Sequence, residues 1–94
     1  IKEVYHEMNV LCDELVSDSE LDMVRNYMIG DFCRSYEGAF AQSDAWIFLN
    51  TNHLNNDFFR NTLEAIRNVQ PDELRQLARR YFDCNKMIEV IAGN

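Results

Sequence analysis

The sequence has few of the residues that supply cofactor binding or covalent cross-links. Its 94 residues include three glycines, one proline, three cysteines and two histidines. The glycines, at positions 30, 38 and 93, are isolated, which excludes a glycine-rich phosphate-binding loop. An odd number of widely spaced cysteines fits neither a disulfide framework nor a zinc motif. We therefore expect buried free thiols at Cys12, Cys33 and Cys84.

Long apolar runs and excess positive charge are also missing. The longest apolar run covers only residues 45–49, whereas a membrane-spanning helix needs about 20 residues. The formal net charge is -7 at pH 7, which predicts an acidic, solvated surface and makes nucleic acid a poor partner. Because the first residue is Ile1 rather than methionine, we expect the chain to begin downstream of its translation start, and its localisation is not predicted.

The spacing of potential ligands does not predict a metal centre. The two histidines, His6 and His53, lie in different parts of the sequence. His6 is followed by Glu7, but Val10 stands where a His-Glu-x-x-His zinc motif requires its second histidine. Pairing His6 with Cys12 is the alternative, and it lacks the further ligands of a zinc site. We therefore expect no metal-binding residue in this chain.

Groups for nucleophilic catalysis or ligand stacking are not distinctive either. Ser43, Asp44 and His53 lie in one region, but no oxyanion-hole motif accompanies them, and such a trio arises by chance. Trp46 and the six phenylalanines are interpreted as core residues rather than a ligand-stacking surface. The sequence therefore predicts neither catalytic nor cofactor-binding residues.

Apolar residues recur at steps of three and four over most of the chain, which predicts about five helices. The second helix opens with Ser17 and Glu20, which can form a capping box. Gly30 lies inside that helix at a cost of about 1 kcal/mol relative to alanine, and we expect close approach of a neighbouring backbone to compensate. The helices are expected at about residues 1–16, 17–36, 39–50, 57–69 and 71–82.

Two stretches differ from an ordinary amphipathic pattern. The helix at 39–50 is apolar nearly all round, which indicates that it is central or covered by a partner. Residues 87–92 are the second stretch, and they are predicted to form an apolar strand after a turn at 83–86. A strand needs a paired neighbour, and the sequence contains no second convincing strand. We therefore expect the rest of the sheet to lie outside this chain.

Six features follow one another along the chain: a capped helix with Glu20 and Gly30, an apolar helix at 39–50, Asp57-Phe58-Phe59, Val69-Gln70-Pro71-Asp72-Glu73-Leu74, Ala78-Arg79-Arg80-Tyr81-Phe82, and a strand that ends at Gly93. This order resembles the C-terminal end of a half-domain in the pitrilysin/insulinase family of zinc metallopeptidases. That family typically shows Val-Thr-Pro-Glu-Asp/Glu near the start of its last helix, then Ala-Arg-Lys-Tyr and a terminal strand. Gln70 departs from the usual threonine.

The resemblance implies a fold. Half-domains of that family are α+β units with a sheet on one side and helices on the other. Residues 1–94 would then be a single fragment, mainly α with about five helices and one C-terminal strand, from the C-terminal portion of such a half-domain. We favour the noncatalytic half of the enzyme. The arginine and tyrosine that this half contributes to substrate binding lie upstream, so Arg79, Arg80 and Tyr81 are not assigned that role.

The resemblance also implies a function. The family binds zinc through an inverted His-x-x-Glu-His motif and a downstream glutamate, which this chain lacks. Zinc is thus expected only in the parent protein, an active metallopeptidase or an inactive homologue. The chain itself would be non-catalytic and would form structural wall of the chamber that holds a peptide substrate. Its partners would be the remainder of the parent peptidase and, in the intact protein, that substrate.

A free-standing helical interaction module is the alternative. Its apolar helix at 39–50 or its strand at 87–92 would bind a partner protein, the strand by adding to a sheet edge. Antiparallel pairing of the same strand with a second copy would give a homodimer. A start methionine directly before Ile1 would favour this module, whereas a long upstream reading frame with His-x-x-Glu-His would favour the peptidase.

Overall fold

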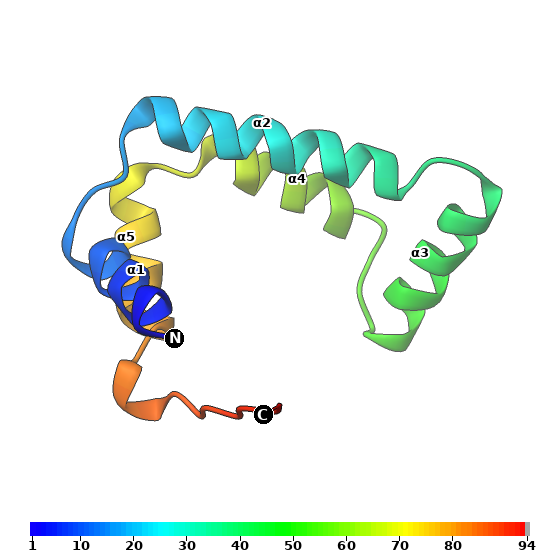
Figure 1. Ribbon diagram of the computed structural model, residues 1–94. Helices are drawn as coiled ribbons and strands as arrows, with labels where there is room; N and C mark the ends of the chain where they lie inside the picture. Colours follow the sequence, from blue (N-terminus) through cyan, green and yellow to red (C-terminus); the bar gives the residue numbers. More distant parts are fainter. Residues whose placement is uncertain (94) are drawn as a thin grey trace. The chain divides into compact units, whose positions relative to one another are not determined.

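A computed structural model describes residues 1–93, and the chain is mainly helical, as the sequence predicts (Figure 1). Over the described residues the elements are α1 Lys2–Asp13, α2 Asp18–Ser35, α3 Ala39–Thr51, α4 Phe58–Asn68, α5 Pro71–Tyr81 and the short 3-10 helix η1 Cys84–Lys86. The five predicted helices are confirmed, with bounds that differ from the expected ones by a few residues at most. The predicted turn at 83–86 is the segment that contains η1.

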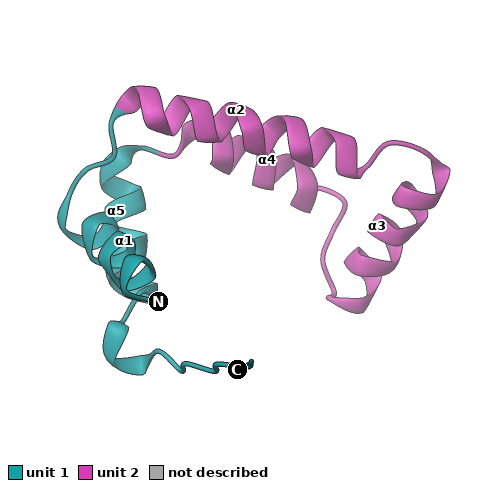
Figure 2. Cartoon of the chain, viewed as in Figure 1, with its two compact units in different colours: residues 1–17, 70–94 teal, residues 18–69 magenta. Residues whose placement is uncertain are grey.

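The helices form two compact units, which Figure 2 shows in different colours. Unit 1 joins residues 1–17 to the chain from Gln70 onward and contains α1, α5 and η1. Unit 2 comprises Asp18–Val69 and contains α2, α3 and α4. Each unit is built on one pair of packed helices, α1 with α5 in unit 1 and α2 with α4 in unit 2.

In unit 1 the apolar side of α5 packs against α1. Leu11 of α1 lines a common hollow with Leu74 and Leu77 of α5, and Ala78 of α5 is buried. Arg79 Nε donates a hydrogen bond of 2.7 Å to the Cys12 carbonyl oxygen in the last turn of α1. Carbonyl groups in a last helical turn have no partner within their own helix. The arginine of α5 therefore caps the C-terminus of α1.

The start of α5 follows the sequence prediction. Pro71 is the first helical residue, where its missing N–H costs nothing. A capping box joins Gln70 and Glu73, and the Glu73 carboxylate accepts a hydrogen bond of 3.3 Å from the Gln70 backbone N–H. Acidic residues occupy the first turn and basic residues the last, which suits the helix dipole. Gln70 is thus the N-cap of α5, at the position where the family that the sequence resembles has threonine.

Aromatic rings join the three helices of unit 2. The ring centroid of Tyr36, just past the end of α2, lies 4.6 Å from that of Phe59 on α4. Phe48 of α3 lies 5.7 Å from Phe58, the first residue of α4. Tilted contacts of this kind contribute about 0.5–1.5 kcal/mol each beyond the burial of their area. The N-terminal turn of α4 is therefore the point at which α2 and α3 both make contact.

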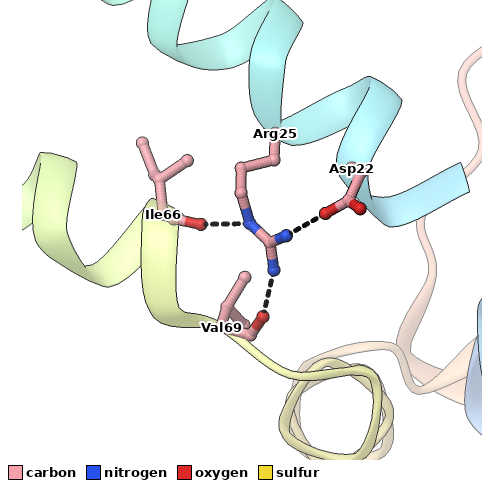
Figure 3. A network of polar contacts seen from close by, with 4 residues as sticks. All are labelled: Asp22, Arg25, Ile66 and Val69. Atoms are coloured by element: carbon pink, nitrogen blue, oxygen red, sulfur yellow. Dashed lines mark hydrogen bonds and ion pairs between the residues drawn. The ribbon is translucent and has the colours of Figure 1, made fainter. Parts of the chain in front are cut away.

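A charged side chain closes the other end of α4 (Figure 3). Arg25 of α2 donates from Nε to the Ile66 carbonyl oxygen at 3.0 Å and from Nη2 to the Val69 carbonyl oxygen at 2.5 Å. Its Nη1 pairs with Asp22, one turn earlier in α2. Only 16% of the Arg25 side chain is exposed. The arginine is therefore a C-terminal cap for α4 that belongs to another helix.

The surroundings of Gly30 differ from those that the sequence predicts. A methyl group added at Gly30 would lie 3.6 Å from Arg34 Nη1, an ordinary van der Waals distance. Among the described residues no neighbouring backbone lies within 4 Å of that position. The expected close approach of a backbone is thus wrong, because the nearest atom is the tip of a flexible side chain on the same helix.

The predicted strand at 87–92 is not formed within the part of the chain that the structure describes. Met87 has an extended backbone, with φ -69° and ψ 135°, but its N–H bonds to the Cys84 carbonyl oxygen and closes η1. The physical reason is the lack of a partner, because extended backbone becomes a strand only through ladder hydrogen bonds to a neighbour. The side chains of Ile88 and Val90 are each 87% exposed and that of Ile91 is 77% exposed.

Candidate functional site

The surface of α3 carries large apolar side chains. Phe40 is 91% exposed, Trp46 58% and Ile47 62%, whereas Leu49 is buried. At about 100° per residue, the three exposed positions are distributed over more than one side of the helix. The remaining elements of unit 2 therefore cover α3 only along the side that contains Leu49. Of the two sequence interpretations, a central position within this chain does not hold, and coverage by a partner stays a prediction.

An open hollow of about 400 Å³ lies within unit 2, between α3 and the α2–α4 pair. It is lined by Phe32, Tyr36, Gln42, Ala45, Trp46, Leu49, Asn56 and Phe59. These residues offer aromatic and aliphatic carbon with two amide side chains, and none is a carboxylate, an imidazole or a thiol. Such a lining can receive an apolar side chain and fix it with a hydrogen bond, and the Tyr36 hydroxyl is its one ordinary acid–base group.

In unit 1, the residues after η1 lie along the N-terminal half of α1. Met87, Ile88, Glu89 and Val90 share an open hollow of about 210 Å³ with Ile1, Val4 and Tyr5. The Tyr5 hydroxyl donates a hydrogen bond to the Glu89 carboxylate, and this bond raises the pKa of Tyr5 above its ordinary value. Partial desolvation and the negative charge of Glu89 act in the same direction, because each disfavours the tyrosinate.

Two thiols meet the same stretch of chain. The Cys12 thiol of α1 donates a weak hydrogen bond of 3.9 Å to the Phe82 carbonyl oxygen. The Cys84 thiol of η1 donates one of 3.5 Å to Asn9 Oδ1, also on α1. We call this line of contacts, from Cys12 through Asn9 to Tyr5, the α1–tail seam. Titratable and nucleophilic side chains from distant parts of the described sequence converge in this seam.

The other residues weighed for catalysis or metal binding are exposed. His6 lies on α1, and Ser43 and Asp44 lie on α3. His53 lies in the loop between α3 and α4 with a positive φ of 55°. Within residues 1–93, no three or more histidine, cysteine or acidic side chains are grouped so that they could hold a metal ion. The buried state expected for the thiols is wrong for Cys33, which is exposed, while Cys12 and Cys84 are half-buried.

Comparisons with known proteins return no match to a family model, to a curated protein or to a solved structure. Across the described residues, every helix is too short or too polar to cross a membrane. Two kinds of surface therefore stand out as candidates for function: the uncovered apolar residues of α3 with their hollow, and the α1–tail seam.

Sequence reasoning missed the seam, although part of its signal was present. Tyr5, Asn9 and Cys12 are spaced by four and three residues, so they occupy one face of a helix. Nothing in the local pattern indicates that Cys84 and Glu89 lie against that face. Hydrogen bonds of this kind join residues that are far apart in sequence, and their partners are fixed only by the packing of α5 on α1.

Proposed function

We propose that this chain is a non-catalytic helical part of a pitrilysin/insulinase-like zinc peptidase, where it forms structural wall of the peptide-holding chamber. The observation that carries the proposal is the amount of apolar surface left uncovered. Only Leu21, Leu49 and Ala78 are buried apolar residues among those described, whereas large apolar side chains are exposed on α3 and after η1. A complete domain of this size has a larger core.

The free energy gained by burying exposed apolar side chains favours contact with a partner. Full burial of one leucine, isoleucine or phenylalanine side chain contributes about 1.5–3 kcal/mol. Phe40 and Ile47 on α3, with Ile88 and Val90 after η1, are four such side chains with most of their surface in water. Two of these side chains belong to unit 2 and two to unit 1, and exposed apolar side chains of this size mark candidate sites of protein contact in each. In the proposed parent, the helical layer would cover its sheet with these residues.

The segment after η1 supports the same proposal from its backbone. Residues 87–92 have the composition of a strand, and within residues 1–93 they pair with no other strand. The half-domain that the sequence resembles would supply the missing strands. The proposed assignment gives these residues a role that the helices of the chain do not provide, because helices satisfy their own backbone groups.

The proposed role places the zinc chemistry elsewhere. The ligands of the family are two histidines and a carboxylate, with a motif glutamate to activate water. No residue of this chain is assigned to that set. Sequencing the reading frame that contains the codon of Ile1 tests the proposal directly. We expect an in-frame His-x-x-Glu-His upstream. If that motif is intact, the purified parent protein should contain zinc and show peptidase activity that a chelator abolishes.

A start codon directly before Ile1 would contradict this proposal and favour the second candidate, a free-standing helical interaction module. The specific observation in its favour is α3, which has exposed apolar residues on more than one side. A module would hold its fold alone and bind a separate protein through that helix. Co-purification of such a partner, lost in Trp46→Ala but kept in Glu64→Gln, an exposed position on α4 outside the hollow, would be its signature.

A further inference from the structure

The contacts of the α1–tail seam follow one another along one face of α1. Moving from the C-terminus of α1 toward its N-terminus, the seam pairs Cys12 with Phe82, Asn9 with Cys84, and Tyr5 with Glu89. The segment after α5 therefore runs antiparallel to α1. Both Cys12 and Cys84 lie in this seam, one contributed by each side of it.

The two thiols contact neighbouring positions of the seam. Phe82, which touches Cys12, precedes Cys84 by two residues, and two residues of extended chain span at most about 7 Å. Asn9, which touches Cys84, is one turn before Cys12, where side chains are neighbours at about 5–6 Å. The two contacts thus place the cysteines on neighbouring parts of the seam, one on each side of it. A disulfide needs a Cα separation of about 4.4–6.8 Å, so η1 must shift along α1 toward Cys12 for the bond to close.

The segment that must move is held locally. The Asp83 carboxylate accepts a hydrogen bond of 3.0 Å from the Asn85 backbone N–H, and Lys86 N–H bonds back to the Asp83 carbonyl oxygen at 3.0 Å. These hydrogen bonds do not involve α1, so they do not oppose a shift of the turn along it. Cys12 and Cys84 are both half-buried, so a small oxidant reaches them from solvent.

We propose that Cys12 and Cys84 form a reversible disulfide that fastens η1 and the following residues to α1. With a disulfide oxidant such as glutathione disulfide, one cysteine thiolate attacks a sulfur of the oxidant and releases one glutathione thiolate. The second cysteine then attacks the mixed disulfide at the protein sulfur and releases the second glutathione. The chain loses two protons and two electrons, and the oxidant gains them as two molecules of reduced glutathione. This inference does not depend on the proposed function.

Cys33 offers Cys12 an alternative disulfide partner in the same chain, so the choice between the two pairs can be measured. It lies on α2, it is exposed, and it is much nearer to Cys12 along the sequence than Cys84 is. In an unfolded chain the entropy of loop closure favours the shorter loop, so Cys12–Cys33 should form roughly six-fold more often than Cys12–Cys84. In the folded chain the seam should reverse that order.

The experiment oxidises the chain with glutathione disulfide in buffer and, separately, in concentrated urea, and maps the bonds by proteolysis and mass spectrometry. We expect a monomer that is about 2 Da lighter, with Cys12–Cys84 as the main pair in buffer and Cys12–Cys33 exceeding it in urea. Cys33→Ser should keep the native pair and should melt at a higher temperature when oxidised, with the increase lost on adding dithiothreitol. A native chain that pairs through Cys33, forms only intermolecular disulfides or stays reduced would overturn the proposal.

Discussion

Arg25 Nη2 donates a hydrogen bond of 2.5 Å to the Val69 carbonyl oxygen and so joins α2 to the residue that ends α4. The same guanidinium reaches the Ile66 carbonyl oxygen through Nε. Carbonyl groups at a helix C-terminus lack partners within the helix. A single side chain therefore supplies two of the groups that α4 needs, and it does so from a largely buried position.

Replacing Arg25 with methionine should lower the free energy of unfolding by roughly 2 kcal/mol, because two carbonyl groups lose a charged donor while the apolar stem is kept. Chemical denaturation measures the change. Arg34→Met is the matched control on the same helix, since Arg34 is exposed and lies 3.8 Å from Asp31. Exposed pairs of that kind contribute little, so the control should change stability by less than about 0.5 kcal/mol. Equal losses in the two variants would contradict the capping role.

Gly30→Ala should stabilise the chain by about 0.5–1 kcal/mol, because alanine removes the helix-propensity penalty and the added methyl group meets only ordinary contacts. Gly38→Ala is the opposite case. Gly38 precedes α3 with φ 87°, a conformation that alanine rarely adopts, so this variant should be less stable. Thermal melts of the two variants should shift in opposite directions, and a destabilised Gly30→Ala chain would reveal a neighbour at that position.

Ser17→Ala should destabilise the chain by roughly 1 kcal/mol through loss of the capping box that the sequence predicts in front of α2, which begins at the next residue. Gln70→Thr should be neutral or stabilising, because threonine is the better cap and Glu73 still accepts from the backbone N–H of residue 70. Urea denaturation of both variants checks this. A neutral Ser17→Ala together with a destabilised Gln70→Thr would show that the helix starts depend on other contacts.

The raised pKa of Tyr5 predicts that the stability of the folded chain depends on pH in the alkaline range. Because the phenol binds its proton more tightly in the folded chain than in the unfolded one, its stabilising contribution is full below the ordinary value of 10.0 and is lost as the pH rises through the higher, folded pKa. Glu89→Gln removes the charge and should bring the pKa of Tyr5 down toward that ordinary value. NMR titration of the Tyr5 ring carbons measures the shift, and an unchanged Tyr5 titration in Glu89→Gln would contradict the contact.

The helices were predictable because their signals are local. Apolar spacing, Pro71 and the acidic first turn of α5 all act within one or two turns of chain, and the helices they indicate are formed. The cap by Arg25 was not predictable, because its carbonyl partners are more than 40 residues away in sequence. Gly30 was misjudged for the same reason, since close packing at a glycine depends on tertiary neighbours.

The predicted strand at 87–92, which is not formed in the described part of the chain, shows what a local sequence pattern cannot decide. Met87, Ile88, Val90 and Ile91 have the composition of a strand, but the ladder must come from another segment. The convergence of Tyr36 and Phe59, or of Phe48 and Phe58, likewise follows from helix packing rather than from spacing. The interpretation of Trp46 and the six phenylalanines as core residues is wrong for Phe40, Trp46, Phe48 and Phe82, which are exposed, whereas Phe32, Phe58 and Phe59 are half-buried.

The unpaired segment after η1 also predicts how the chain associates. A second copy could pair with it antiparallel near Glu89 and Val90, and the approach of the two Glu89 carboxylates would keep the affinity modest. Sedimentation should then show a dimer that Val90→Pro converts to a monomer with its helices intact, because proline removes a ladder N–H. Glu89→Gln should strengthen the dimer, and a dimer that is indifferent to both changes would have to use another surface.

We propose above all that residues 87–92, which form no strand in the described part of this chain, become a strand in the sheet of a larger half-domain. Amide hydrogen exchange at Ile88 and Ile91, measured on the monomeric chain and on the same residues within its full reading frame, tests this most directly. The account predicts fast exchange in the monomer and strong protection in the longer protein, where ladder hydrogen bonds form. Strong protection in the monomeric chain, or none in the longer protein, would contradict it.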